Sequence, residues 1–172
     1  MRVGLLPMGD LPTTLLSWLS DALASFGIVC AIHPSVPVPA RARDPSQARC
    51  DADAILRILA ASPHEGTLLA VTAEDLGAEG REFVFGLASA RDGVAIVSLA
   101  RLEAGEPGKF RDRLRKEAVH EIGHTLGLDH CANPGCVMYF SATILDTDEK
   151  RAAFCGRCRG RLPRTIASAA GP

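Results

Sequence analysis

Several features that would place a protein in a membrane are missing from this sequence of 172 residues. No stretch approaches the roughly 20 consecutive apolar residues that a membrane-spanning helix requires. The apolar stretch Val3 to Met8 is followed too soon by glycine, aspartate and proline for the apolar core of a secretory signal peptide to form. Internal repeats and long low-complexity segments are also absent from the sequence. We therefore expect a soluble, cytoplasmic protein that does not associate with membranes.

Neither sign of charge is in excess, because 19 Lys and Arg stand against 20 Asp and Glu, for a formal net charge of −1. This balance argues against a general binder of polyanions. Basic residues are concentrated at 111–116 and at 151–164, and we expect both stretches to be solvated faces. Aromatic residues are scarce, at 5% of the chain, and the second basic stretch offers few of them for stacking on bases. No nucleic-acid partner is expected.

Hydrophobic residues make up 47% of the chain and charged residues 23%, which is typical of a globular domain with a substantial core. Short apolar segments between turn residues predict strands at 2–8, 28–33, 67–72, 82–88 and 94–99, and apolar residues at helical spacing predict helices at 13–26, 51–61 and 109–126. The turn at 91–93 is expected to join the last two strands as an antiparallel hairpin. This order implies an α/β (α+β) fold with a mixed, twisted, five-stranded sheet backed by helices.

The segments between these elements are expected to be loops, notably 40–50, which includes Pro45, and 74–80. Beyond the third helix, a further helix is expected to begin at Asp146 or Thr147, with Glu149 completing a capping box from Asp146. That helix would lead the chain to its last two cysteines.

The most informative stretch is His120-Glu121-Ile122-Gly123-His124, which falls on the expected third helix. At about 100° per residue the two histidines lie one turn apart on one face, so both imidazoles can reach a single metal ion. The carboxylate of Glu121 lies beside that face, where it can bond a metal-held water without being a ligand. This arrangement predicts a zinc site that activates water.

A third histidine, His130, cannot share that ion if the helix continues, because it would lie about 9 Å beyond His124 along the axis. Gly127 stands where the helix must end, and glycine adopts the left-handed conformation there without a Cβ penalty. The chain can then turn back and bring His130 to the metal. Three neutral imidazoles and a water form an open site, which is typical of catalytic zinc.

Four of the six cysteines have the spacing of a second metal site. Cys131 and Cys136 form one pair, and Cys155 and Cys158 form a CxxC pair, a common half of a tetrahedral thiolate site. A four-thiolate site has no open position, so we expect it to hold a structural zinc and to pin the loop that carries His130. Two disulfides are the alternative interpretation.

The whole pattern, HExxHxxGxxHC followed by CxM and a closing CxxC over residues 120–158, resembles the archaemetzincins, a metzincin-clan family of small zinc metallopeptidases. The resemblance implies two zinc ions per chain, one catalytic and one structural. It implies that strand 82–88 is an antiparallel edge strand lining the cleft, to which a peptide can add. It also makes Met138 the methionine of the Met-turn, which packs beneath the catalytic metal without binding it. Some metzincins carry a tyrosine ligand two residues later, where this chain has Phe140.

We therefore expect a single metallopeptidase domain over residues 1–172. Its N-terminal subdomain, 1–127, would hold the sheet and the active-site helix, and its C-terminal subdomain, 128–172, would hold the Met-turn and the four-cysteine site. The expected partner is a peptide or small protein substrate, and the chain is expected to be a monomer.

Two functions remain open from the sequence. In the first, the chain is a zinc peptidase with Glu121 as the general base, and the resemblance implies aminopeptidase-like activity. Endopeptidase action stays open, because no feature of the chain clamps a free N-terminus. In the second, the four-cysteine unit and the basic C-terminal segment form a non-catalytic module that binds nucleic acid or a protein. Glu121 favours the first, since a structural zinc has no use for a carboxylate beside its water. Asp129 either orients an imidazole or is an ordinary surface carboxylate.

Overall fold

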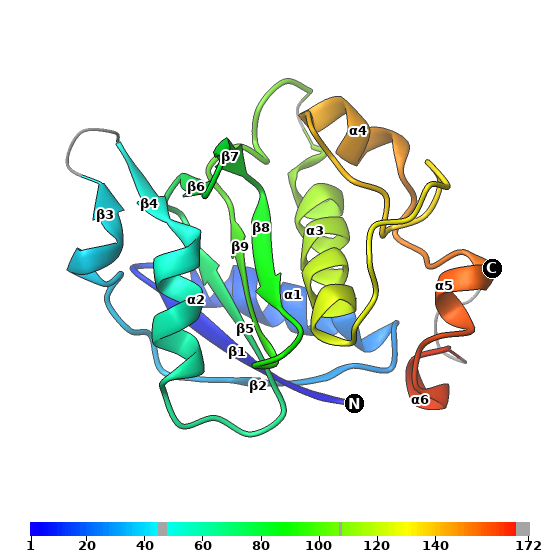
Figure 1. The fold of residues 1–172 in the computed structure, drawn as a ribbon, viewed down its shortest axis with the longest axis horizontal. Coiled ribbons are helices and arrows are strands. Elements are labelled where there is room, and N and C mark those ends of the chain that lie inside the picture. The colour runs from blue at the N-terminus through cyan, green and yellow to red at the C-terminus, as the bar shows by residue number, and fades with distance from the viewer. Residues whose placement is uncertain (45–47, 107, 168–172) are drawn as a thin grey trace.

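The computed structural model describes residues 1–44, 48–106 and 108–167. Its main sheet has five strands in the order β2-β1-β5-β9-β8 (Figure 1). Their bounds are Arg2–Met8 for β1, Val29–Ile32 for β2, Thr67–Thr72 for β5, Gly86–Ser89 for β8 and Val94–Ser98 for β9. Strands β2, β1, β5 and β9 are parallel, and β8 runs antiparallel to β9 at one edge. The predicted mixed five-stranded sheet with an antiparallel edge strand is confirmed.

Helices cover both faces of this sheet (Figure 1). The helices α1 (Thr13–Ala24) and α3 (Phe110–Thr125) pack on one face, and α2 (Ala52–Ala60) packs on the other. A hydrophobic core lies on each face of the sheet, and successive side chains of a strand point alternately into the two cores. Strand β5 is therefore buried along its whole length. Asp51 is the N-cap of helix α2, and its carboxylate accepts a hydrogen bond from the Ala54 N–H at 3.0 Å.

A second, smaller sheet was not predicted. Its strands, in the order β3-β4-β6-β7, are Arg43–Asp44 for β3, Arg49–Asp51 for β4, Leu76–Ala78 for β6 and Arg81–Val84 for β7. The loops predicted at 40–50 and 74–80 were therefore wrong in part, because strands of two to three residues are too short to show alternation; Pro45 lies outside the described residues. The predicted strand 82–88 is divided between the two sheets at Phe85, which is buried.

The described part of the segment after α3 contains three short helices, which are Ile144–Glu149 for α4, Gly156–Arg159 for α5 and Arg164–Ala167 for α6. A 3₁₀ turn, Ala40–Ala42, precedes β3. The predicted start of α4 was wrong. Thr143 is the N-cap, and its hydroxyl accepts from the Asp146 N–H while the Asp146 carboxylate accepts from the Thr143 N–H. Asp146 is thus the distal member of the box rather than the cap. Over the described ranges, no helix combines the length and the apolar character needed to cross a bilayer.

The basic stretch 111–116 is not a simple solvated face, which corrects the prediction. Arg113 is buried on α3, and its Nε and Nη2 atoms donate to the two carboxylate oxygens of Asp148 at 2.6 and 2.8 Å. Its Nη1 atom donates to the carbonyls of Leu102 and Ala104 at 2.9 and 2.5 Å. This bidentate pair fastens α4 to the helix that carries the histidines.

We expect Asp148→Asn to destabilise the fold by about 3 kcal/mol at pH 7, because it leaves a buried guanidinium without its counter-charge. Hydrogen bonds from Arg113 hold the pKa of the Asp148 carboxyl below its ordinary value. The stabilisation is therefore complete above the ordinary carboxyl pKa and is lost as the pH falls through the lower folded-state pKa. Urea unfolding between pH 3 and pH 7 measures this loss. The free energy of unfolding of Asp148→Asn should change less with pH than that of the wild type. Glu74→Gln, which weakens the exposed Arg43–Glu74 pair, is the control and should cost less than about 1 kcal/mol.

Candidate active site

Helix α3 carries His120, Glu121 and His124 and ends at Thr125, just before Gly127. Gly127 has φ +79°, the left-handed conformation expected of it. The N–H of Gly127 donates to the His124 carbonyl at 2.9 Å, which satisfies one of the last carbonyls of the helix. The chain reverses there and brings His130 back beside the helical histidines.

The ring nitrogens of His120, His124 and His130 converge on one point. Their candidate ligand atoms all lie within 4.8 Å of one another, and Nε2 of His120 is 3.0 Å from Nε2 of His124. Two imidazole nitrogens on one tetrahedral zinc, each about 2.0–2.1 Å from the ion, lie about 3.3 Å apart. The donor set therefore fits a single zinc ion.

Backbone carbonyls orient two of the rings. Nδ1 of His120 lies 2.8 Å from the Val137 carbonyl, and Nδ1 of His124 lies 2.7 Å from the Leu128 carbonyl. A proton on each Nδ1 donates to its carbonyl and leaves the Nε2 lone pair for the common centre. Burial lowers the pKa of all three histidines, in His130 to about 4. Near pH 7 the imidazoles are therefore neutral, which is the form that binds a metal.

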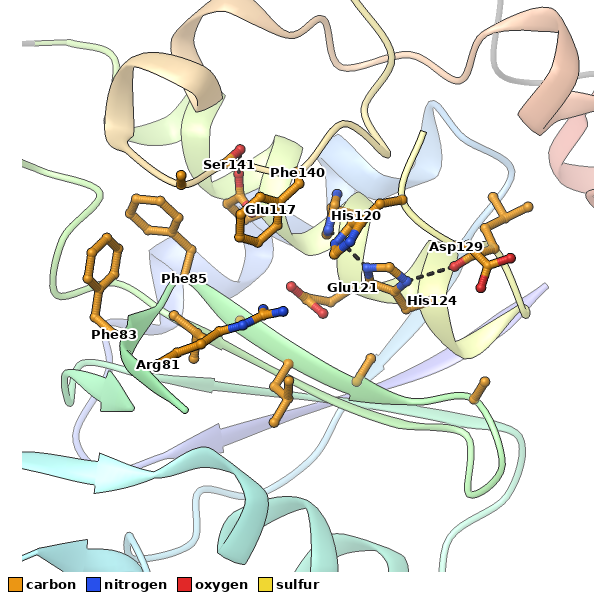
Figure 2. Close-up of a pocket in the computed structure, with 18 of the residues that line it drawn as sticks. Arg81, Phe83, Phe85, Glu117, His120, Glu121, His124, Asp129, Phe140 and Ser141 are labelled. Carbon is orange, nitrogen blue, oxygen red and sulfur yellow. Dashed lines mark hydrogen bonds between the residues drawn. The ribbon is translucent and has the colours of Figure 1, made fainter. Parts of the chain in front are cut away.

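Glu121 is buried, with 4% of its surface exposed, beside the histidines. Figure 2 shows its carboxylate between the rings of His120 and His124 and the guanidinium of Arg81. Burial, and then the charge of Glu117, raises the pKa of Glu121 well above its ordinary value. A carboxylate shifted in this direction is a stronger proton acceptor.

Gly86, on strand β8, provides the space for Glu121. A Cβ at this position would lie 2.6 Å from Oε1 of Glu121 and 2.7 Å from the carbonyl oxygen of Ile96. The backbone of β9 cannot move away easily, so only glycine fits against the carboxylate.

We expect Gly86→Ala to lower kcat at least tenfold through displacement of Glu121, because small misplacements of a reacting group are costly. Hydrolysis kinetics together with zinc content would measure this. Zinc content should stay at the wild-type value, since the rings of the histidines are not touched. The control is Gly160→Ala, whose Cβ would make ordinary contacts no closer than 3.5 Å. Equal kinetics for the two variants would show that the close packing against Gly86 has no role.

Met138 packs against helix α3 at Gly123. It is fully buried, and its sulfur occupies the space where a Cβ on Gly123 would stand. The carbonyl of Met138 accepts a hydrogen bond from the Cys131 N–H at 2.9 Å. Two residues on, the ring of Phe140 lies 4.9 Å from the ring of His130. The chain after His130 is thus tied both to the helix and to itself.

The four cysteines at 131, 136, 155 and 158 also converge, with sulfur atoms within 4.8 Å of one another. The sulfurs of Cys131 and Cys155 are 3.7 Å apart, and four thiolates about 2.3 Å from a tetrahedral zinc lie about 3.8 Å apart. All cysteines in the described part of the chain are free thiols, which does not support the alternative of two disulfides. A hydrogen bond from the Cys158 backbone lowers the pKa of Cys155 to about 7, whereas burial raises the pKa of Cys158. Four thiols in this arrangement can hold zinc.

The site also contains residues that sequence reasoning missed. The cleft has a volume of about 520 Å³, and its lining includes Arg81, Phe83 and Glu117. Glu117 is buried and accepts from Nζ of Lys150 at 2.9 Å. Its position one helical turn before Glu121 is a signal that could have identified it. Arg81 and Lys150 come from other elements, and nothing in the motif points to them.

Asp129 is a surface carboxylate rather than a partner of an imidazole, which settles that alternative. Its side chain is 87% exposed and lies 3.5 Å from Nη2 of Arg161. It lines the cleft on the side of the histidines away from Arg81 (Figure 2).

Comparison with known proteins gives consistent results. The model of peptidase family M54 matches residues 48–164. The archaemetzincin of Natronomonas pharaonis is 36% identical in an alignment that covers 94% of this chain and 99% of that protein. The structure of the archaemetzincin from Archaeoglobus fulgidus superposes with a TM-score of 0.85 at 33% identity, covering 94% of this chain and 100% of that one. The structure of a zinc-dependent peptidase from Methanocorpusculum labreanum superposes with a TM-score of 0.83 at 32% identity, covering 94% of this chain and 100% of that one.

Proposed function

Because this chain belongs to peptidase family M54, the archaemetzincins, and is thus a zinc metallopeptidase, we propose that His120, His124 and His130 hold its catalytic zinc and that Glu121 is its general base. The observation that carries the proposal is the convergence of the three imidazoles within 4.8 Å, with a buried carboxylate beside them. A zinc ion in this position lowers the pKa of a bound water toward neutrality and polarises a carbonyl oxygen.

The protein groups then have distinct tasks. The carbonyls of Val137 and Leu128 keep the rings of His120 and His124 aimed at the ion. The Glu121 carboxylate accepts the proton of the attacking water and passes it to the nitrogen of the leaving amine. Its burial between α3 and β8 strengthens it as a proton acceptor, which is the property that the first step needs.

We propose that Cys131, Cys136, Cys155 and Cys158 hold a second, structural zinc, so that the chain binds two. Cys131 follows His130 directly, and its N–H donates to the Met138 carbonyl. A closed thiolate site would therefore fix both the third histidine and the methionine beneath the histidines. In this proposal Met138 is the Met-turn residue and residues 1–172 form one domain.

The substrate is proposed to be a peptide that adds to the free edge of β8. Among the described residues, β9 is the only strand that pairs with β8, and Gly86, Leu87 and Ala88 line the cleft. The other side of β8 offers backbone donors and acceptors to an extended peptide.

A digest of a peptide library, followed by mass analysis of the products, tests this function. The zinc-loaded protein should hydrolyse peptides, and a chelator that removes the histidine-bound zinc should stop hydrolysis. Libraries with free and with acetylated N-termini separate the two cleavage modes, because aminopeptidase-like action needs the free amine. A zinc-loaded protein that cleaves no peptide in either library would contradict the proposal and favour the non-catalytic module.

A further inference from the structure

Arg81 is the one arginine or lysine among the described residues that line the cleft. It begins strand β7, and its guanidinium carbon lies 5.1 Å from the centre of the Phe140 ring. That ring packs in turn against His130. Burial raises the pKa of Glu121 and lowers that of His130, and the charge of Arg81 contributes to the pKa of both. Arg81 is thus held over the cleft, close to the residues of the proposed site.

Arg81, whose charge opposes the burial that raises the pKa of the nearby Glu121 (Figure 2), forms no ion pair within 4 Å with a carboxylate in the part of the chain that the structure describes. Other arginines do, and examples are Arg43 with Glu74, Arg101 with Asp75 and Arg113 with Asp148. The buried Glu117, which also lines the cleft, is paired with Lys150. Arg81 is exposed and lines the cleft, so its donors remain accessible to a ligand that enters there.

The contact with Phe140 orients these donors without using them. A cation over an aromatic ring interacts through the ring face, whereas the N–H donors of a guanidinium lie in its own plane. A carboxylate that enters the cleft can accept two parallel hydrogen bonds from that plane. The ring thus restricts a flexible side chain in advance, which lowers the entropy cost of binding.

The polarity of the cleft agrees with a carboxylate at this end. Strand β8 runs from Gly86 to Ser89, away from Arg81 (Figure 2). Antiparallel pairing is the more stable per residue, and a peptide paired in this way with β8 runs toward Arg81. The peptide's carboxyl side would then meet Arg81. At the other side of the histidines lies Asp129, which carries the opposite charge (Figure 2).

We propose that Arg81 is a specificity-determining residue that selects peptides with a carboxylate on the carboxyl side of the cleaved bond. The proposal rests on the peptidase function above. The carboxylate is that of an Asp or Glu side chain or the C-terminal carboxylate of a short peptide, and both present the same group to the guanidinium.

The test compares peptides that differ only in this group. A peptide cleaved in the library digest is made with Glu, Gln or Lys at each position after the cleaved bond, and each version is made as a C-terminal acid and as an amide. We expect the wild type to favour carboxylates by roughly 10- to 100-fold in kcat/KM, the range of a hydrogen bond to a charged group. In Arg81→Met, the ratio of kcat/KM for the peptide with the carboxylate to kcat/KM for its uncharged counterpart should fall close to one. Arg81→Glu should instead favour the peptide with Lys. If kcat/KM differs between the Glu and Gln peptides, Arg81 binds a side-chain carboxylate. If kcat/KM differs between the acid and the amide, Arg81 binds the C-terminal carboxylate.

The matched control is Arg111→Met. Arg111 also lies over an aromatic ring, 5.3 Å from the centre of Trp18, but it does not line the cleft. This variant should keep the wild-type ratio. Equal rates for Glu and Gln and for acid and amide in the wild type, or an unchanged ratio in Arg81→Met, would overturn the proposal. An equal loss on every peptide would instead assign Arg81 to the reaction itself.

Binding separates this proposal from the peptidase function. The affinities of the same peptides are measured on zinc-loaded Glu121→Gln protein with and without Arg81→Met. If no single peptide is cleaved, library pools that contain glutamate or glutamine take the place of these peptides. One outcome is that peptides with a carboxylate bind more tightly, that this preference depends on Arg81, and that the protein with Glu121 intact cleaves no peptide. That result would support the recognition of carboxylates by Arg81 and contradict the peptidase function. Hydrolysis without such a preference would do the reverse.

Discussion

Replacement of Glu121 by glutamine is expected to lower kcat about 10³-fold and to leave the zinc content unchanged. Glutamine keeps the shape of the side chain but cannot accept a proton at neutral pH, and general-base catalysis typically contributes 10²- to 10⁴-fold. Zinc is expected to remain, because the three imidazoles converge within 4.8 Å without the carboxylate.

The measurement is steady-state kinetics on a peptide from the library digest, with zinc determined on the same samples. Glu121→Ala should lose activity to a similar degree, which separates loss of the base from any effect of the glutamine amide. Glu82→Gln, another carboxylate that lines the cleft, is the control and should stay within a few-fold of wild type. Turnover by Glu121→Gln within tenfold of wild type would remove the general-base role.

Replacement of Cys158 by serine is expected to reduce the zinc content from two ions to one per chain and to destabilise the protein by several kcal/mol. Apparent binding free energies of structural zinc are about 10–16 kcal/mol in small domains, and a hydroxyl is a poor substitute for a thiolate ligand. Hydrolysis should fall by at least about 10- to 100-fold, because Cys131 adjoins His130 and its N–H holds the Met138 carbonyl.

Zinc stoichiometry, urea unfolding and limited proteolysis of the region after residue 128 would measure these effects. Cys30→Ser is the matched control, since Cys30 is a half-buried free thiol outside the cluster. It should keep both ions and most of the stability. Two ions and wild-type unfolding in Cys158→Ser would contradict a structural role for the thiolate site.

Much of the fold was predictable because the long elements carry a strong local pattern. Strand β5 contains a continuous apolar run, and helix α3 carries apolar residues at helical spacing, at 110, 114, 118 and 122. The five-stranded sheet follows from the order of the strands and helices along the chain. The predictions failed where the pattern was short or ambiguous. Strands β3, β4 and β6 have too few residues to alternate, and the cap of α4 lay one turn earlier, at Thr143.

Burial of charge was also beyond the sequence pattern. The stretch 111–116 has the composition of a solvated face, yet Arg113 is buried because Asp148, on a different helix, supplies its counter-charge. A pattern of hydrophobic and charged residues does not show which distant carboxylate will pair with a given arginine.

By itself the sequence determined the reactive groups of this protein and their local spacing. His120, Glu121 and His124 lie on one helix, where the residue spacing dictates the geometry, and Gly127 adopts the left-handed conformation at which the chain turns back. The tertiary structure alone decided what surrounds those groups, including the space at Gly86, the buried pair of Glu117 with Lys150 and the position of Arg81. Spacing along the chain fixes distances only within one rigid element, whereas contacts between elements depend on how the sheets and helices pack.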